Sequence, residues 1–370
     1  MIPAIAGRIP LVGRAKAPAL PLGERINHLT GLTVAPAGGS HHDLVARACG
    51  VLNYAALVAS DVGLPDLATD LCWRQHKVFT DAGRLTGRVA VMSLMPLVNL
   101  ARLHTRADHG ELAYNVLHRL NDAARHRNKT HIDGRTVDLS ALTGTDEDHR
   151  TVCQELYVTL LVDGARALAQ IGRWAEAADT MARHRGIGNR LLDGRQIKIM
   201  ALMEQGLDQQ ARDLIDTTQP AEPWERPVAL FLHAHSRPAE APLPEADLNR
   251  TLEEAVQLIA HPDPSTAAFS TRTALSALEL DRAGCHAARI LDALVGAARL
   301  DAYTAREALH HPVAAYALGN GASVALTAMV AVAGLGCGAL PAYNHKVLTF
   351  AIGDAKRELE RLLQADPDPG

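Results

Sequence analysis

A loop rich in glycine and arginine, residues 184–195, is the most suggestive polar cluster of the sequence. Gly186 and Gly188 precede a helical pattern, and amides at the start of a helix attract anions. The flanking arginines add positive charge, so the loop predicts binding of an anionic group. Its candidate ligands are His184, Arg190, Asp193 and Arg195. The alternative is an ordinary turn, because a G-x-G pattern alone is weak evidence and no strand precedes this one.

The 18 histidines raise the question of a metal site. Their nearest groupings, at residues 41–43, 233–235 and 310–311, lack the ligand spacing of known zinc sites, so we expect no metal and no cofactor. The motifs of serine hydrolases, P-loop proteins, zinc proteases and kinases are missing as well. An enzyme of specialised metabolism that modifies peptides stays open as an alternative, with a site assembled from distant residues. Its candidates are His131, Asp133, His149, His184 and Asp193.

Composition favours an all-α protein. Hydrophobic residues make up 48% of the 370-residue chain and aromatic residues only 4%, whereas alanine and leucine, the strongest helix formers, are abundant. The 31 arginines against six lysines are typical of a GC-rich genome such as that of an actinobacterium. A net charge of −4 leaves no basic excess for a phosphate backbone, so we expect no nucleic-acid partner.

Two features bear on the cellular compartment. The five cysteines form no CxxC pair, which predicts small core residues in a reducing compartment, and prolines interrupt the N-terminus where a signal peptide needs an apolar run. The apolar stretch Val324–Leu340 is long enough to suggest a membrane span. Because it is mostly alanine and glycine and is followed by Pro341, we expect a buried helix with a glycine-rich turn after it. The predicted location is the cytoplasm, without a membrane partner.

Proline and glycine divide the chain into segments. Residues 1–39 have no sustained period and predict an extended arm, after which helices should begin at Ser40. Ser40 and Thr145 each precede an acidic residue by three places, the arrangement of a capping box. Six prolines predict a linker over residues 219–247, and helical periodicity returns irregularly over residues 248–370.

An internal repeat is the clearest architectural signal. Gly172 is followed five residues later by Ala177, and Gly206 is followed by Ala211 at the same spacing. The two glycines lie 34 residues apart, which is the tetratricopeptide period. Glycine permits the tight turn between two helices, and the small alanine lets the helices approach closely.

At these residues the chain resembles the tetratricopeptide-repeat family. Bulky residues four places beyond each alanine, Met181 and Ile215, continue the family pattern. Looser copies of the spacing begin at Gly63 and Asp108, each with an alanine five residues on. Their separations depart from the period, so insertions must lie between the units.

The clearest insertion is at residues 128–144. Alternating side chains around Asp133 and Gly134 are the signature of a small β-hairpin, which we expect to form a flap between the second and third helical pairs. The resemblance implies an α-solenoid of stacked helical hairpins over residues 40–218, with the flap inserted and an irregular helical C-terminal half.

The resemblance also implies a binding groove, because the first helices of stacked pairs line the concave face of such solenoids. Amides there can bridge the backbone of an extended peptide, and arginine can hold a carboxylate by two bonds. The inward polar candidates are Asn53, Asn99, Arg102, Asp163, Arg166, Asp193 and Gln196. The leading hypothesis is a module that binds a peptide or protein segment in a regulatory or biosynthetic complex. The alternative is an empty groove in which Arg166 merely pairs with Asp163 on the same helix.

Overall fold

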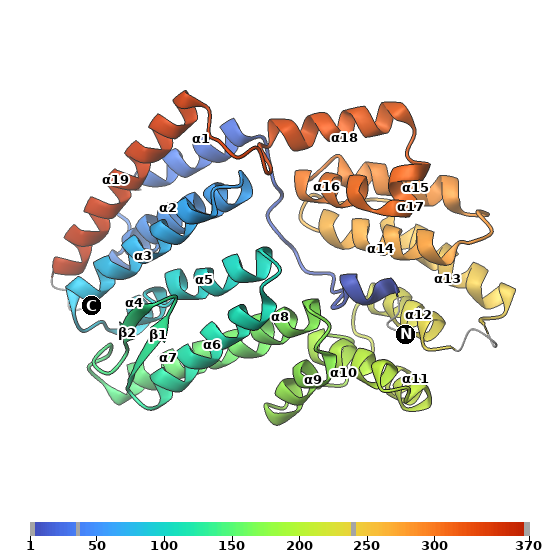
Figure 1. Ribbon diagram of the computed structural model, residues 1–370, viewed down its shortest axis with the longest axis horizontal. Helices are drawn as coiled ribbons and strands as arrows, with labels where there is room; N and C mark the ends of the chain where they lie inside the picture. Colours follow the sequence, from blue (N-terminus) through green and yellow to red (C-terminus); the bar gives the residue numbers. More distant parts are fainter. Residues whose placement is uncertain (1–3, 35–37, 238–241, 366–370) are drawn as a thin grey trace. The chain divides into compact units, whose positions relative to one another are not determined.

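The computed structural model describes residues 4–34, 38–237 and 242–365, and these residues are mostly helical (Figure 1). The all-α prediction is confirmed at this level. The chain divides into two compact units. Unit 1 comprises Met1–Pro21 and Leu168–Leu335, and unit 2 comprises Leu22–Ala167 and Gly336–Gly370.

Unit 2 is built from helices that pack as neighbours along the chain. The largest contacts join α2 to α3, α3 to α5 and α5 to α6, and the C-terminal α19 packs against α1, α2 and α3. Figure 1 shows α19 beside α1 and α2. The helices are α1 (Leu22–Thr33), α2 (His41–Asp61), α3 (Pro65–Ala82), α4 (Gly87–Met92), α5 (Met95–Arg106), α6 (Gly110–Arg125), α7 (Asp146–Thr159), the π-helical turn η2 (Leu160–Gly164), α8 (Ala165–Gln170), which begins here, and α19 (Ala342–Gln364).

Unit 1 contains the remaining helices and the N-terminal segment. Successive helices again pack on one another, most extensively α14 on α15, α9 on α10 and α16 on α18. The elements are η1 (Ala4–Arg8), α9 (Trp174–Arg183), α10 (Asp193–Glu204), α11 (Asp208–Asp216), α12 (Glu225–His235), α13 (Glu245–Ile259), α14 (Ala267–Leu280), α15 (Ala287–Ala298), α16 (Ala302–His310), α17 (Pro312–Ala317) and α18 (Asn320–Val332).

The four turns singled out in the sequence share one backbone geometry. Gly63, Asp108, Gly172 and Gly206 all have positive φ, between 59° and 87°. In each turn the residue after this one donates its amide to a carbonyl five residues back, which is the bond that closes a helix end. The alanine five residues beyond each turn residue is fully buried in every case. The repeated spacing therefore corresponds to a repeated local structure.

Ser40 and Thr145 cap their helices as predicted, although the acidic residue of each pair bonds to the capping hydroxyl and not to the capping amide. The amide of Asp43 donates to Ser40 Oγ at 3.2 Å, and the amide of Asp148 donates to Thr145 Oγ1 at 3.1 Å. In both, the acidic side chain accepts a hydrogen bond from the hydroxyl group of the capping residue. These bonds satisfy donors that the first helical turn leaves open.

Two segments expected to lack helices contain them. Within residues 1–39, Leu22–Thr33 forms α1, which buries Leu22, Ile26 and Leu29. Within residues 219–247, Glu225–His235 forms α12, whose proline lies in the first turn, where its missing amide costs nothing. The expected arm and linker thus each hold a packed helix. Residues 1–3, 35–37, 238–241 and 366–370 of the expected segments lie outside the described residues.

The predicted β-hairpin is confirmed. Strands β1 (Lys129–Ile132) and β2 (Arg135–Asp138) pair antiparallel, with Asp133 and Gly134 in the turn at positive φ. Ile132 and Val137 are buried in the core of unit 2, and β1 contacts α6. The hairpin is therefore part of that core.

The apolar stretch Val324–Leu340 was expected to form a buried helix, and the structure differs from that expectation. It forms α18 followed by a turn with Gly334, Gly336 and Gly338 at positive φ, but Leu326 is the one residue of α18 that is buried. Its exposed residues include Val324 and Val332, at 61% and 60%. The prediction of a helix is thus confirmed, but the prediction that this helix is buried is wrong. No helix within the described ranges is long and apolar enough to cross a membrane.

The cysteines are all free of disulfides. Cys49 and Cys72 are buried, and burial raises the pKa of each thiol to about 12. Cys153 is half-buried, whereas Cys285 and Cys337 are exposed. The prediction of core cysteines therefore holds for the first two and is wrong for the last two.

Candidate functional site

A row of polar side chains crosses three helical elements of unit 2. Asn99 Nδ2 on α5 donates to Asn53 Oδ1 on α2 at 2.9 Å. Arg102 Nη1 lies 3.4 Å from Asn99 Oδ1, and Arg102 Nε donates to Asp163 Oδ2 on η2 at 2.9 Å. We call Asn53, Asn99, Arg102 and Asp163 the polar row. Four of the predicted groove residues thus come together as expected from their positions before the repeated turns.

The polar row is partly open to solvent. The side chain of Arg102 is 49% exposed and that of Asp163 is 25% exposed. A guanidinium has five N–H donors, and here Nε and Nη1 are the engaged nitrogens among the described residues. The geometry leaves the other donors of Arg102 available to an acceptor from solution.

Asp163 lies in an unusual backbone element. The turn η2 is π-helical, and such turns inside α-helices are rare and frequent at functional sites. Gly164 completes it, and a Cβ on Gly164 would come within 3.0 Å of Leu160 Cδ1 and 3.3 Å of Tyr114 Cδ2. A small residue is therefore required for α6 to pack closely beside Asp163.

Beside the polar row lies a second group of paired acidic and basic side chains, which the sequence analysis did not predict. Arg106 lies four residues after Arg102 on the same face of α5, and its Nη1 donates to Asp61 Oδ1 at 2.5 Å. Asp61 also accepts from Arg25 on α1, and the side chains of Asp61 and Arg25 are 2% and 1% exposed. The sequence signal that could have revealed Arg106 is its i,i+4 spacing from Arg102.

Arg166 lies on α8 and is half-buried. Its predicted neighbour Asp163 forms its ion pair with Arg102 of another helix. This ion pair of Asp163 joins two helical elements, α5 and η2.

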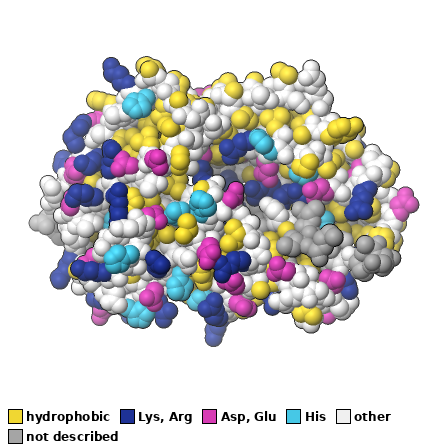
Figure 2. Space-filling model, viewed as in Figure 1, with side chains coloured by type: hydrophobic (Ala, Val, Ile, Leu, Met, Phe, Trp, Pro, Cys, Tyr) yellow, Lys and Arg dark blue, Asp and Glu magenta, His cyan; other side chains and the backbone are white. Residues whose placement is uncertain are grey.

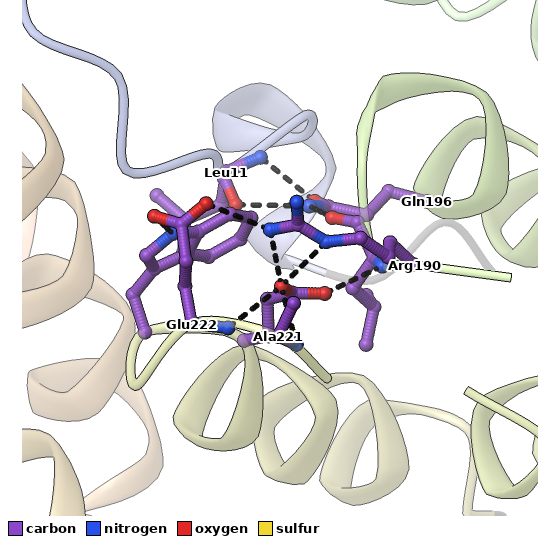
Figure 3. A network of polar contacts seen from close by, with 8 residues as sticks. Leu11, Arg190, Gln196, Ala221 and Glu222 are labelled. Carbon is purple, nitrogen blue, oxygen red and sulfur yellow. Dashed lines mark hydrogen bonds and ion pairs between the residues drawn. The ribbon is translucent and has the colours of Figure 1, made fainter. Parts of the chain in front are cut away.

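The predicted anion site of the 184–195 loop is occupied by a carboxylate of the chain itself (Figure 3). Glu225, fully buried, accepts from Arg190 Nη2 at 2.6 Å and from the amide of Leu191 at 3.0 Å. Burial alone would raise the pKa of Glu225, but the bonds from Arg190 and from the amides of Ala221, Leu191 and Glu222 outweigh it and lower the pKa. The loop binds an anionic group, as expected, but an internal one.

Other residues of this loop also have internal partners. Arg195 is 6% exposed and donates to the carbonyls of Gly188 and Leu214 and to Thr217 and Thr218. Burial lowers its pKa. His184 follows the last residue of α9 and is its C-cap. Arg195 and Arg190 thus have partners within unit 1, and these contacts stabilise its fold.

Asp193 and Gln196 face the N-terminal segment. Asp193 pairs with Arg14, and Gln196, fully buried, bonds to the main chain of Leu11. Both residues belong to unit 1, whereas the polar row belongs to unit 2. Gln196 thus holds the backbone of a segment of the same chain, and Asp193 holds a side chain of that segment.

Gly194 explains why the loop needs glycine. A Cβ there would lie 2.2 Å from the carbonyl oxygen of Gly186. We expect Gly194→Ala to lower the free energy of unfolding by about 1–3 kcal/mol, because backbone must move to admit the methyl group. Gly188→Ala is the matched control in the same loop, since nothing lies within 4 Å of its Cβ position. Urea denaturation of both variants checks this, and equal stabilities would contradict the close approach.

The residues of the enzyme hypothesis do not form one cluster within a unit. His131 and His149 are in unit 2, whereas His184 and Asp193 are in unit 1. Asp133 faces His104, at 3.1 Å from its Nε2, and His149 Nε2 lies 3.6 Å from Cys153 Sγ. Among the residues that the structure describes, no group of three or more His, Cys, Asp or Glu side chains could hold a metal ion.

Acidic and basic side chains are interspersed over the face seen in Figure 2. This distribution agrees with the small net charge of the chain.

No protein-family model, curated protein or solved structure matches the chain. The relationship to tetratricopeptide repeats accordingly stays a prediction.

Proposed function

We propose that the chain is a tetratricopeptide-like binding module that takes an extended peptide or protein segment along the first helices of its stacked pairs in unit 2. The observation that carries the proposal is the polar row. Helices α2 and α5 and the turn η2 each contribute to it, and they occupy equivalent places before the repeated turns.

The chemistry of the row suits a main chain with an acidic group. Asn53 and Asn99 offer amide donors and acceptors, which match the alternating groups of an extended backbone. Arg102 is held by Asp163 in a fixed orientation while half of its side chain remains exposed. A ligand carboxylate, from an acidic side chain or a C-terminus, would meet an arginine already positioned for it.

The test is selection of peptides from a random library displayed with free C-termini, with the full chain as bait. We expect the selected peptides to bind the Arg102→Glu variant about 10–100-fold more weakly than the wild type, the range expected for the loss of one charged hydrogen bond. Arg74→Glu is the control, because Arg74 on α3 is 59% exposed and lies outside the row. Peptides that bind the wild type, R102E and R74E equally would refute the proposed site.

A further inference from the structure

The N-terminal segment of unit 1 is held in an extended form by polar side chains. Residues 11–20 have no helix or strand. The amide of Leu11 donates to Gln196 Oε1 at 2.8 Å, and Gln196 Nε2 donates back to the Leu11 carbonyl at 2.9 Å (Figure 3). The side chain of one buried glutamine, Gln196, thus hydrogen-bonds to both the amide and the carbonyl of Leu11.

A second clamp holds the same segment eight residues later. The amide of Ala19 donates to Asp301 Oδ1 at 2.7 Å, and the amide of Ala302 donates to the Ala19 carbonyl at 3.2 Å. Between the clamps, the amide of Lys16 donates to the carbonyl of Ser265 at 2.7 Å. With the segment in place, Gln196 and Asp301 are 0% and 4% exposed, so both clamps are shielded from water.

Three side-chain positions of the segment are recognised individually. Leu11 is buried at 1% exposure. Gly13 lies against the ring of Trp224, whose Cδ1 would be 2.7 Å from a Cβ at this position. Arg14 pairs with Asp193, whose side chain is 5% exposed. The contacts therefore specify the form aliphatic-x-Gly-Arg.

Between its clamps the segment is loosely held. Residues 14–17 are exposed, and the side chain of Arg14 is 41% exposed even in its ion pair. A surface hollow lined by residues 15–18 and 263–265 adjoins this span. Within residues 9–19 the buried apolar side chains are Ile9, Leu11 and Ala19, and the span from residue 12 to residue 18 has none to resist local detachment.

We propose that unit 1 carries a binding site for extended peptides of the form aliphatic-x-Gly-Arg, occupied in cis by residues 9–19 of the chain. The site is independent of the polar row, since its residues come from α10, the segment between α13 and α14 and the start of α16. A partner segment with the same form would replace residues 9–19 and release them from the clamps. Pro18, which lies between the clamps, fixes its own φ and so reduces the entropy lost when the segment is bound.

The experiment uses the full chain and a labelled synthetic peptide of residues 7–21. In the wild type the cis segment competes at an effective concentration on the order of millimolar, so micromolar peptide should bind weakly. Leu11→Asp disfavours burial of the cis segment, and Arg14→Glu opposes Asp193 at a half-exposed position without altering the core. We expect either variant to bind the peptide at least about tenfold more tightly than the wild type does.

The Gln196→Ala change provides the site control. Added to R14E, it should remove the gain in peptide affinity, and a peptide with Arg14 replaced by glutamate should not bind. Faster tryptic cleavage at Lys16 reports release of the cis segment. If R14E releases the segment by this measure but gains no affinity for the peptide, or if the gain persists with Q196A, residues 9–19 are only a structural strap and the proposal fails.

Discussion

Replacing Asp61 by alanine should lower the free energy of unfolding by about 3–5 kcal/mol, the range for removing one partner of a buried ion pair. Asp61 is the last residue of α2, and its carboxylate accepts from Arg25 and Arg106. The guanidinium of Arg25 is buried at 1% exposure and cannot lose its proton, so the variant would leave a buried charge without this carboxylate. Urea denaturation of the full chain measures the effect.

Asp163→Ala is the matched control for that variant. Asp163 also pairs with an arginine of α5, but Arg102 is 49% exposed and water can replace the lost carboxylate. We expect a loss of at most about 1 kcal/mol. A double variant, Arg25→Met with Asp61→Leu, should recover most of the stability lost in D61A, because no charge remains buried. A D61A variant as stable as D163A would show that burial does not govern this junction.

The repeated turns were predictable because their chemistry is local. A positive φ favours glycine, and a close helix approach favours alanine, so the spacing of Gly172 with Ala177 revealed both. Asn99, Arg102 and Asp163 lie six or nine residues before such turns, and the structure brings their side chains together. The same counting applies to any helix whose end is fixed by such a turn.

The helix α1 was missed although its buried residues follow a helical period. Leu22, Ile26 and Leu29 recur at helical spacing, but Arg25 is buried on the same face and breaks the apolar pattern. The partner that makes this burial possible, Asp61, lies 36 residues away. A single sequence contains no sign of that pairing.

Partners that are distant in the sequence also explain why the 184–195 loop binds groups of its own chain. Arg190 meets Glu225 at a separation of 35 residues, and Gln196 meets Leu11 at a separation of 185. Local chemistry indicated an anion and an extended backbone as groups that these side chains could bind. It could not indicate that the chain supplies both of them itself.

Acid should destabilise each unit through one half-buried histidine. Burial lowers the pKa of His76 in unit 2 and of His235 in unit 1 from 6.5 to about 4. His76 Nδ1 and His235 Nε2 are buried and have no hydrogen-bond partner among the described residues. Around His235, Glu279 favours the protonated ring, whereas Arg8 and Arg282 oppose it. A proton on either ring therefore costs more in the folded state than in the unfolded one.

The sign of the pH effect follows from the depressed pKa. Above about pH 6.5 both states carry neutral rings, and the free energy of unfolding does not depend on these groups. As the pH falls from 6.5 to 4 the unfolded state takes up the proton first, so stability should decline by up to about 1.4 kcal/mol per pH unit for each histidine. Below pH 4 the folded rings are protonated as well, and this contribution levels off.

Urea denaturation between pH 7.5 and 4.5 measures that slope, and two variants assign it. His76→Gln and His235→Gln should each flatten the decline, whatever they do to the stability at pH 7.5, because glutamine does not titrate. His126→Gln is the control, since that side chain is 58% exposed and should leave the slope as in the wild type. If the H76Q and H235Q curves run parallel to the wild-type curve, the acid sensitivity must come from the carboxylates, and the burial of these two rings has no thermodynamic consequence.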